Sequence, residues 1–157
     1  MIRYLQNRKR VKLVNKIIDL WYGSSMKSIK VEDLFEPRPK LGTVCFFIGS
    51  IDSLCQSLKL EDSLFAKISL NFFSDKDFYK FNQIAPALLK NYFGNNQRVE
   101  FATYAMKLGA MSFLDWYNSS FLSIEAVDKL AKLIKEWNRK PNLEGDEIYL
   151  FIGRVKG

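Results

Sequence analysis

The stretch LGTVCFFIGSIDSLCQSL at residues 41–58 is apolar over most of its length, yet it contains two glycines and an aspartate. On a helical wheel its large apolar residues form one broad face: Val44, Phe47, Ile48, Ile51, Leu54 and Leu58. The opposite face holds Gly42, Gly49, Asp52, Ser53 and Gln56. Because glycine is a poor helix former and Phe46 borders this second face, we expect a close packing partner there rather than solvent.

A second segment, near residues 97–118, carries a matching stripe of small residues on its apolar side. Small residues at the centre of an apolar face allow two helix backbones to approach closely. The two stripes therefore predict either an internal helix crossing, which we favour, or an open groove for a partner. Their residues are Gly42, Gly49, Ser53, Ala102, Ala105, Gly109 and Ser112.

Apolar periodicity predicts helices near residues 7–22, 42–58, 61–74, 76–93, 97–118 and 123–138. Glycine, serines and two prolines mark residues 23–40 as a linker, with a short turn at 31–35. The sequence thus predicts one all-α domain over residues 1–157, a compact bundle of about five to six helices with a short β-prone C-terminal tail. Its parts are a basic amphipathic helix (1–22), the linker, a helical core (41–140) and an extended tail (141–157).

The positive charge is concentrated at the N-terminus. The chain carries a net charge of +7, and six basic residues precede Asp19, the first acidic one: Arg3, Arg8, Lys9, Arg10, Lys12 and Lys16. The wheel predicts that Leu13, Val14, Ile17, Ile18, Leu20 and Trp21 face the bundle while Arg8, Lys12 and Lys16 face solvent. Arg8, Lys9, Arg10, Lys12 and Lys16 form a candidate site for an anionic surface, either nucleic acid or acidic lipid.

The tail contains a β-prone run whose interaction residues are Ile148, Leu150, Phe151 and Ile152. Such a strand either packs over the helices or pairs with a second copy of the chain or another protein.

Several catalytic chemistries are excluded because the chain contains no histidine and no glycine-rich phosphate loop. Cys45 and Cys55 lie too far apart along one helix to bridge, and we expect both to be core atoms. A catalytic pair made of Asp52 and Asp115 is disfavoured, since surface carboxylates are common. We predict no catalytic residue, no metal site and no cofactor.

Residues 104–134, YAMKLGAMSFLDWYNSSFLSIEAVDKLAKLI, resemble the final two helices of TetR-type repressors, a pair through which those domains commonly dimerise. No segment resembles the recognition helix of that family, so no DNA-binding residue is carried over.

No run of residues is long and apolar enough to span a membrane, and the N-terminus lacks the features of a signal peptide, so we expect a cytoplasmic protein. The preferred hypothesis is a non-enzymatic protein-interaction module: an adaptor, chaperone-like protein or regulatory subunit that binds another protein or a second copy of itself. The alternative is an anionic-surface binder that acts through the basic N-terminal helix.

Overall fold

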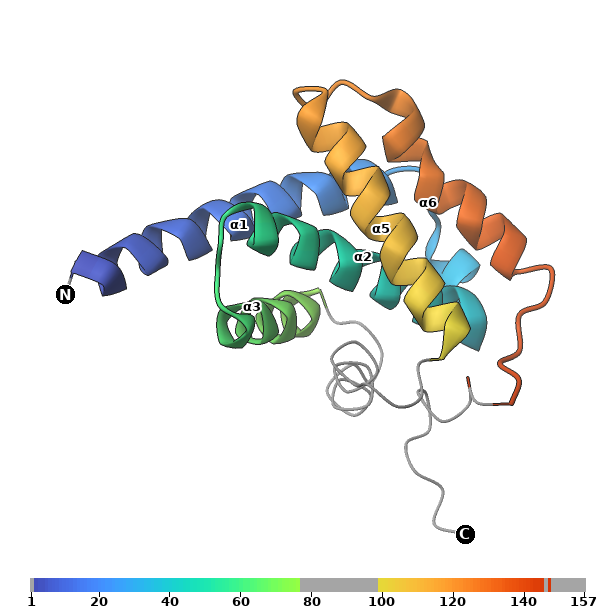
Figure 1. Ribbon diagram of the computed structural model, residues 1–157. Coiled ribbons are helices and arrows are strands. Elements are labelled where there is room, and N and C mark those ends of the chain that lie inside the picture. Colours follow the sequence, from blue (N-terminus) through green and yellow to red (C-terminus); the bar gives the residue numbers. More distant parts are fainter. Residues whose placement is uncertain (1, 77–98, 146, 148–157) are drawn as a thin grey trace, which may run out of the picture.

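The computed structural model describes residues 2–76, 99–145 and 147, and every regular element within them is helical (Figure 1). These elements are α1 (Ile2–Met26), the short 3-10 helix η1 (Val31–Leu34), α2 (Pro37–Ser57), α3 (Asp62–Asp75), α5 (Glu100–Asn118) and α6 (Ile124–Trp137). The predicted all-α class is therefore confirmed. The helix expected at 76–93 and the β-prone run at 148–152 lie outside the described residues.

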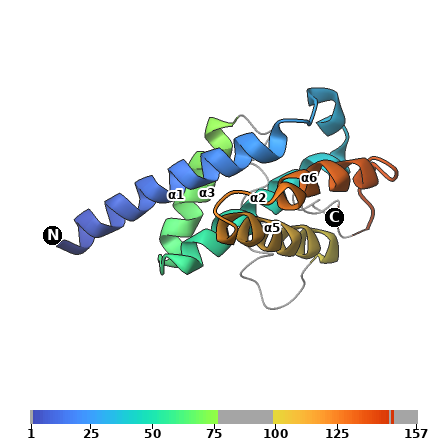
Figure 2. The same cartoon turned by 90° about the horizontal axis from the view of Figure 1, so that it is seen from above.

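Helix α2 is the centre of the fold. Every residue from Leu41 to Ile51 is buried, and the helix contacts α1, α3, α5 and α6 (Figures 1 and 2). This explains why residues 41–58 lack a polar side in their first half: a helix surrounded by other helices is apolar or small all round. Between Leu41 and Ile51 both faces that the wheel separated are internal, whereas Gln56 is exposed.

Aromatic side chains fill the space between α1, α2 and α5. The Trp21 ring stacks on Phe46 and meets Phe113 edge to face, with ring centroids 6.1 Å and 5.9 Å apart. The Trp116 ring lies closer still, with its centroid 5.1 Å from that of Trp21. Offset and edge-to-face ring pairs of this kind add to the stabilisation that burial provides.

Helices α1 and α2 are both longer than the sequence predicted. Helix α2 begins at Pro37, so the two prolines assigned to the linker belong to its first turn. Proline is tolerated there because the first amides of a helix have no acceptor within it. Helix α1 begins at Ile2 and continues to Met26, beyond both predicted ends. The turn expected at 31–35 is present as η1.

Arg38 holds the chain that follows α6 against the start of α2. Its guanidinium donates to the carbonyl oxygens of Lys140 and Asn142, at 2.7 Å and 3.2 Å, and forms a bidentate pair with the Glu147 carboxylate. It also lies over the Phe101 ring, 4.8 Å from the centroid. Bidentate pairs of this type fix geometry as well as adding energy, so the beginning of the tail is attached to the bundle.

Candidate functional site

The small-residue stripes lie inside the bundle, where α2 crosses α5. A Cβ atom on Gly49 would overlap the backbone carbonyl of Met106, and one on Gly109 would overlap that of Phe46. The backbones thus touch at two reciprocal points, and no larger side chain fits between them. The stripe residues Gly42, Gly49, Ser53, Ala102, Ala105, Gly109 and Ser112 are all buried, although Gly42 faces the Trp137 ring of α6 instead of α5.

Ser50 bridges three helices at this crossing, and the sequence analysis missed it. Its hydroxyl accepts a hydrogen bond from the Trp21 indole at 2.9 Å and lies 3.0 Å from the carbonyl oxygen of Gly109 on α5. The sequence contained a signal for such a contact, because Trp21 was expected to be buried and a buried tryptophan needs an acceptor for its N–H group. The role of Ser50 is to satisfy buried polar groups.

Neither thiol is set up for chemistry. Cys45 and Cys55 are both free and buried. Burial raises the pKa of Cys45 far above its ordinary value, and burial together with the nearby Asp52 carboxylate raises the pKa of Cys55 to about 12. A thiol is nucleophilic as the thiolate, so both groups are inert at neutral pH.

The carboxylates of Asp52 and Asp115 do not form a dyad among the described contacts. Asp52 accepts a hydrogen bond from the Gln56 amide, at 2.7 Å, on its own helix. Asp115 is exposed on α5. A general acid and base act on a shared substrate position, and the contact of Asp52 with Gln56 and the exposure of Asp115 give no sign of such a position.

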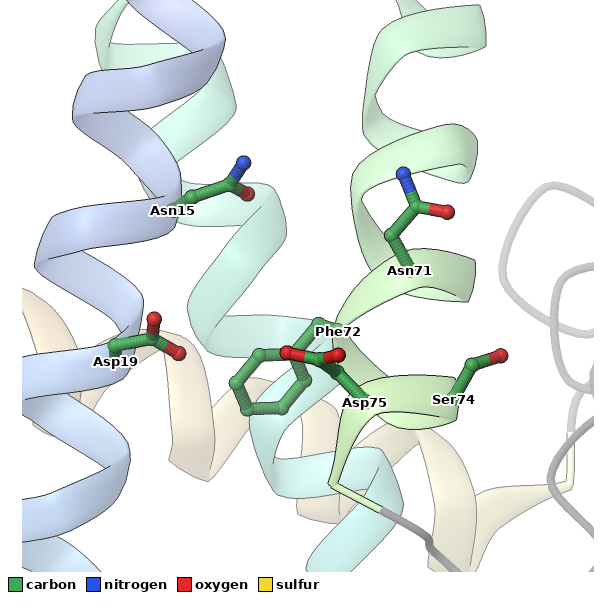
Figure 3. A pocket seen from close by; sticks show the side chains of 6 residues that line it. All are labelled: Asn15, Asp19, Asn71, Phe72, Ser74 and Asp75. Carbon is green, nitrogen blue, oxygen red and sulfur yellow. The ribbon is translucent and has the colours of Figure 1, made fainter.

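A polar cleft of about 520 Å³ separates α1 from α3 (Figure 3). Asn15 and Asp19 point from α1 toward α3, where Phe72 and Asp75 face them. The Lys76 ammonium lies 2.9 Å from the Asp19 carboxylate and thereby compensates part of the negative charge. In the parts of the chain described, no group of three or more histidine, cysteine, aspartate or glutamate side chains is arranged to hold a metal ion.

The N-terminal part of α1, residues 2–13, extends past α2 and α3, and we call it the arm (Figures 1 and 2). None of its side chains is buried; the first buried residue of α1 is Val14. The predicted anion-binding residues Arg8, Lys9, Arg10, Lys12 and Lys16 are all exposed. These charges are therefore in contact with solvent, and anion binding by them stays a prediction.

The predicted contact face of α1 is wrong in part. Leu13 and Leu20 were expected to face the bundle, but they are 45% and 51% exposed. The buried stripe is Val14, Ile17, Ile18, Trp21 and Ser25. This stripe is narrower than the wheel suggested, because the helix touches the bundle along one side only. Leu13 and Leu20 remain as apolar side chains on the outer surface.

The turn between α5 and α6, residues 119–123, exposes large apolar side chains, and we call it the apolar turn. Leu122 and the adjoining Ile124 are 77% and 75% exposed, and Phe121 is 46% exposed. No charged residue lies between Asp115 and Glu125. A surface of this kind is typical of a protein-binding site.

The backbone of the apolar turn is held firmly in an uncommon conformation. Ser120 and Phe121 have positive φ angles of 58° and 69°, and residues other than glycine rarely adopt such angles. The Ser119 hydroxyl accepts hydrogen bonds from the amides of Leu122 and Ser123, at 3.2 Å and 2.9 Å. The Phe121 ring stacks on Trp116 at 4.4 Å. Strain that persists under such support is often found at binding sites.

From the sequence, this turn was expected to be a plain connection between two helices. The uncharged run WYNSSFLSI at residues 116–124 was the available signal, since surface turns usually carry charged or small polar residues. The predicted tail residues Ile148, Leu150, Phe151 and Ile152 lie outside the described residues.

Comparison with known proteins gives no relative: no family model, no curated protein and no solved structure matches the chain. The resemblance of residues 104–134 to TetR-type repressors thus receives no support. In the described segments, none of the helices has the length and apolar character needed to cross a membrane.

Proposed function

We propose that the protein is a non-enzymatic interaction module, of the adaptor or regulatory-subunit kind, that binds another protein through the apolar turn. The observation that carries this proposal is the combination of Leu122 and Ile124, both about three-quarters exposed, on a backbone fixed by hydrogen bonds. A backbone held in one conformation loses little entropy on binding, which favours affinity.

The chemistry of the apolar turn indicates its partner. Phe121, Leu122 and Ile124 project from an uncharged segment, so the complementary surface is an apolar pocket that excludes water. Another protein or a second copy of this chain can supply such a pocket. Protonated, buried thiols and the separate positions of Asp52 and Asp115 support a binding role over a catalytic one.

Affinity capture from the native cell, followed by quantification of stoichiometric partners, tests the proposal. The test variant is Leu122→Ser with Ile124→Ser, and the control is Val31→Ser with Phe35→Ser, at sites that are 75% and 65% exposed on another part of the surface. We expect the test variant to lose the partner and the control to keep it. Sedimentation of both variants shows whether that partner is a second copy. Equal recovery with both variants contradicts the proposal.

A second candidate function, the binding of a polyanion, is favoured by the geometry of the arm. Its cations are exposed on a helix that extends away from the other described helices (Figures 1 and 2). The two functions are compatible, since the arm and the apolar turn are different surfaces.

A further inference from the structure

The cations of the arm, together with Lys16 just after it, are available to a partner. Arg8, Lys9, Arg10, Lys12 and Lys16 are exposed, and none forms an ion pair with the described residues. Arg3 pairs with Glu61 at 2.6 Å, but both side chains are mostly exposed, so this contact is weak and easily exchanged. No acidic side chain occurs along α1 before Asp19. Six positive charges thus follow one another along the helix without compensation from their own segment.

These cations point in several directions around the helix axis. At about 100° per residue, Arg8, Lys12, Lys16 and Lys9 occupy one arc of about 100°. Arg3 and Arg10 lie together on another side, about 100° or more from that arc and in line with the buried stripe of Val14, Ile17 and Trp21 farther along α1. A flat anionic surface contacts one side of a helix, whereas the walls of a groove contact two. The distribution of charge fits a groove.

The apolar side chains of α1 argue against a lipid surface. A helix that lies in a membrane interface separates its apolar face from its charged face. On α1 the exposed Leu13 and Leu20 lie on the same side as Lys9 and Lys16, within about 60° of them around the axis. Burying these leucines among acyl chains would bury the lysines with them.

The dimensions of the arm match a nucleic-acid groove. Twelve helical residues span about 18 Å, and an α-helix with side chains is about 10–12 Å across. The major groove of B-DNA is about 12 Å wide and has phosphates along both walls. The arm extends past α2 and α3 (Figures 1 and 2), and its contact with the start of α3, the Arg3–Glu61 pair, has to open when the arm enters such a groove.

We propose that the arm binds a nucleic-acid duplex, with Arg8 and Lys12 contacting the phosphates of one strand and Arg3 and Arg10 those of the other. Lys9 and Lys16 extend the first set of contacts. This inference rests on the second candidate function, polyanion binding, and names its partner. Since phosphates carry no sequence information, the interaction is not selective for sequence.

The test measures binding of the full chain to a fluorescent DNA duplex of about 20 base pairs, by anisotropy, over a range of salt concentrations. Each phosphate contact contributes about 0.9 to the slope of log affinity against log salt, so six contacts predict a slope near −5. We expect Arg8→Gln with Lys12→Gln to reduce the slope by about 2, and Arg3→Gln with Arg10→Gln to do the same.

Lys132→Gln with Lys135→Gln is the matched control, because it removes two exposed positive charges from α6 and is expected to leave the slope unchanged. Circular dichroism of each variant verifies that the helices are intact. A reduced slope in only one of the two arm variants overturns the proposal, since a single side of the helix is then in contact. An equal reduction in the control also overturns it.

A titration with vesicles of phosphatidylserine and phosphatidylcholine, at the same salt concentrations, distinguishes duplex binding from polyanion binding in general. We expect weaker binding to vesicles than to the duplex. Tighter binding to vesicles contradicts the inference while leaving polyanion binding in place. Binding to neither probe contradicts both, and the protein-interaction role of the apolar turn is then judged by its own experiment.

Discussion

The crossing of α2 with α5 and the arm of α1 use the same secondary structure for opposite purposes. At the crossing, Gly49 and Gly109 bring two backbones into contact, and the neighbouring side chains are buried and uncharged. On the arm, no residue from 2 to 13 is buried, and the charges are all positive. Packing stabilises the first region, whereas the second contacts the bundle through Val11 and the exposed Arg3–Glu61 pair.

This difference indicates where stability and function reside. Most helical stability in proteins comes from packing of an apolar face, and isolated helices shorter than about 12–15 residues are marginal in water. Of the residues of the arm, Val11 alone is packed against the hydrophobic core, so a bound partner adds to the stabilisation of this part of α1. We therefore expect substitutions at the crossing to change folding and substitutions on the arm to change binding.

The largest effect is expected from Gly49→Ala. An added methyl group overlaps the Met106 carbonyl, so the two helices must separate, and we expect a loss of about 3 kcal/mol in the free energy of unfolding. Gly23→Ala is the control, because nothing lies within 4 Å of the added atom. Alanine at this helical position should stabilise the protein by up to about 1 kcal/mol. Urea unfolding measures both changes, and equal effects would contradict close contact at the crossing.

Ser50→Ala is expected to have the next largest effect. It leaves the fully buried Trp21 indole without its acceptor, which costs about 2 kcal/mol. Ser57→Ala removes a comparable hydroxyl from an exposed position on the same helix, and we expect a change within about 0.5 kcal/mol. Thermal unfolding followed by calorimetry compares the two variants. If Ser50→Ala leaves the unfolding temperature unchanged, the hydrogen bond between α1 and α2 adds no stability.

The buried thiols predict a loss of stability at alkaline pH. The pKa of Cys55 is raised to about 12 in the folded protein, whereas the unfolded thiol ionises near 9.0. The unfolded chain therefore releases protons first, and stability is complete below pH 9 and falls above it. Each such thiol contributes roughly 1.4 kcal/mol per pH unit in this range. Urea titrations between about pH 8 and pH 10.5 should show that the free energy of unfolding declines less steeply with pH for Cys55→Ala than for the unmodified protein. An identical decline would mean that the thiol is accessible to water.

The smallest effect on stability is expected on the arm. Replacement of Arg8, Lys9, Arg10 and Lys12 by glutamine removes four exposed charges that lack partners among the described residues, so the free energy of unfolding should change by less than about 0.5 kcal/mol. The same urea experiment used for Gly49→Ala measures this. A loss of more than about 1 kcal/mol would show that the arm belongs to the folded core.

The sequence predicted the crossing because its signal is local and chemical: glycines within an apolar helix require a close neighbour. It also predicted the exposure of the basic residues, since long charged side chains are seldom buried. The orientation of α1 was predicted only in part, because Leu13 and Leu20 differ from the buried Val14 and Ile17 in position around the axis and not in chemistry. Which side of a helix meets the bundle depends on the other helices.

The apolar turn and the Arg38 anchor were not predicted, for two physical reasons. Arg38 binds groups more than 100 residues away in the chain, and no local pattern encodes that proximity. The positive φ angles at Ser120 and Phe121 depend on the stacking of Phe121 with Trp116 and on the Ser119 hydroxyl. Neither serine nor phenylalanine indicates a left-handed conformation by itself.

Hydrogen exchange of the backbone amides, with and without a DNA duplex, tests most directly the claim that the arm is stabilised by a partner and the crossing by packing. We expect the amides of residues 5–13 to exchange rapidly in the free protein and to become protected when the duplex is added. The amides around Gly49 and Gly109 should exchange slowly in both conditions, because they open only with the whole fold. Strong protection of the arm in the free protein, or no change on addition of the duplex, would contradict the account.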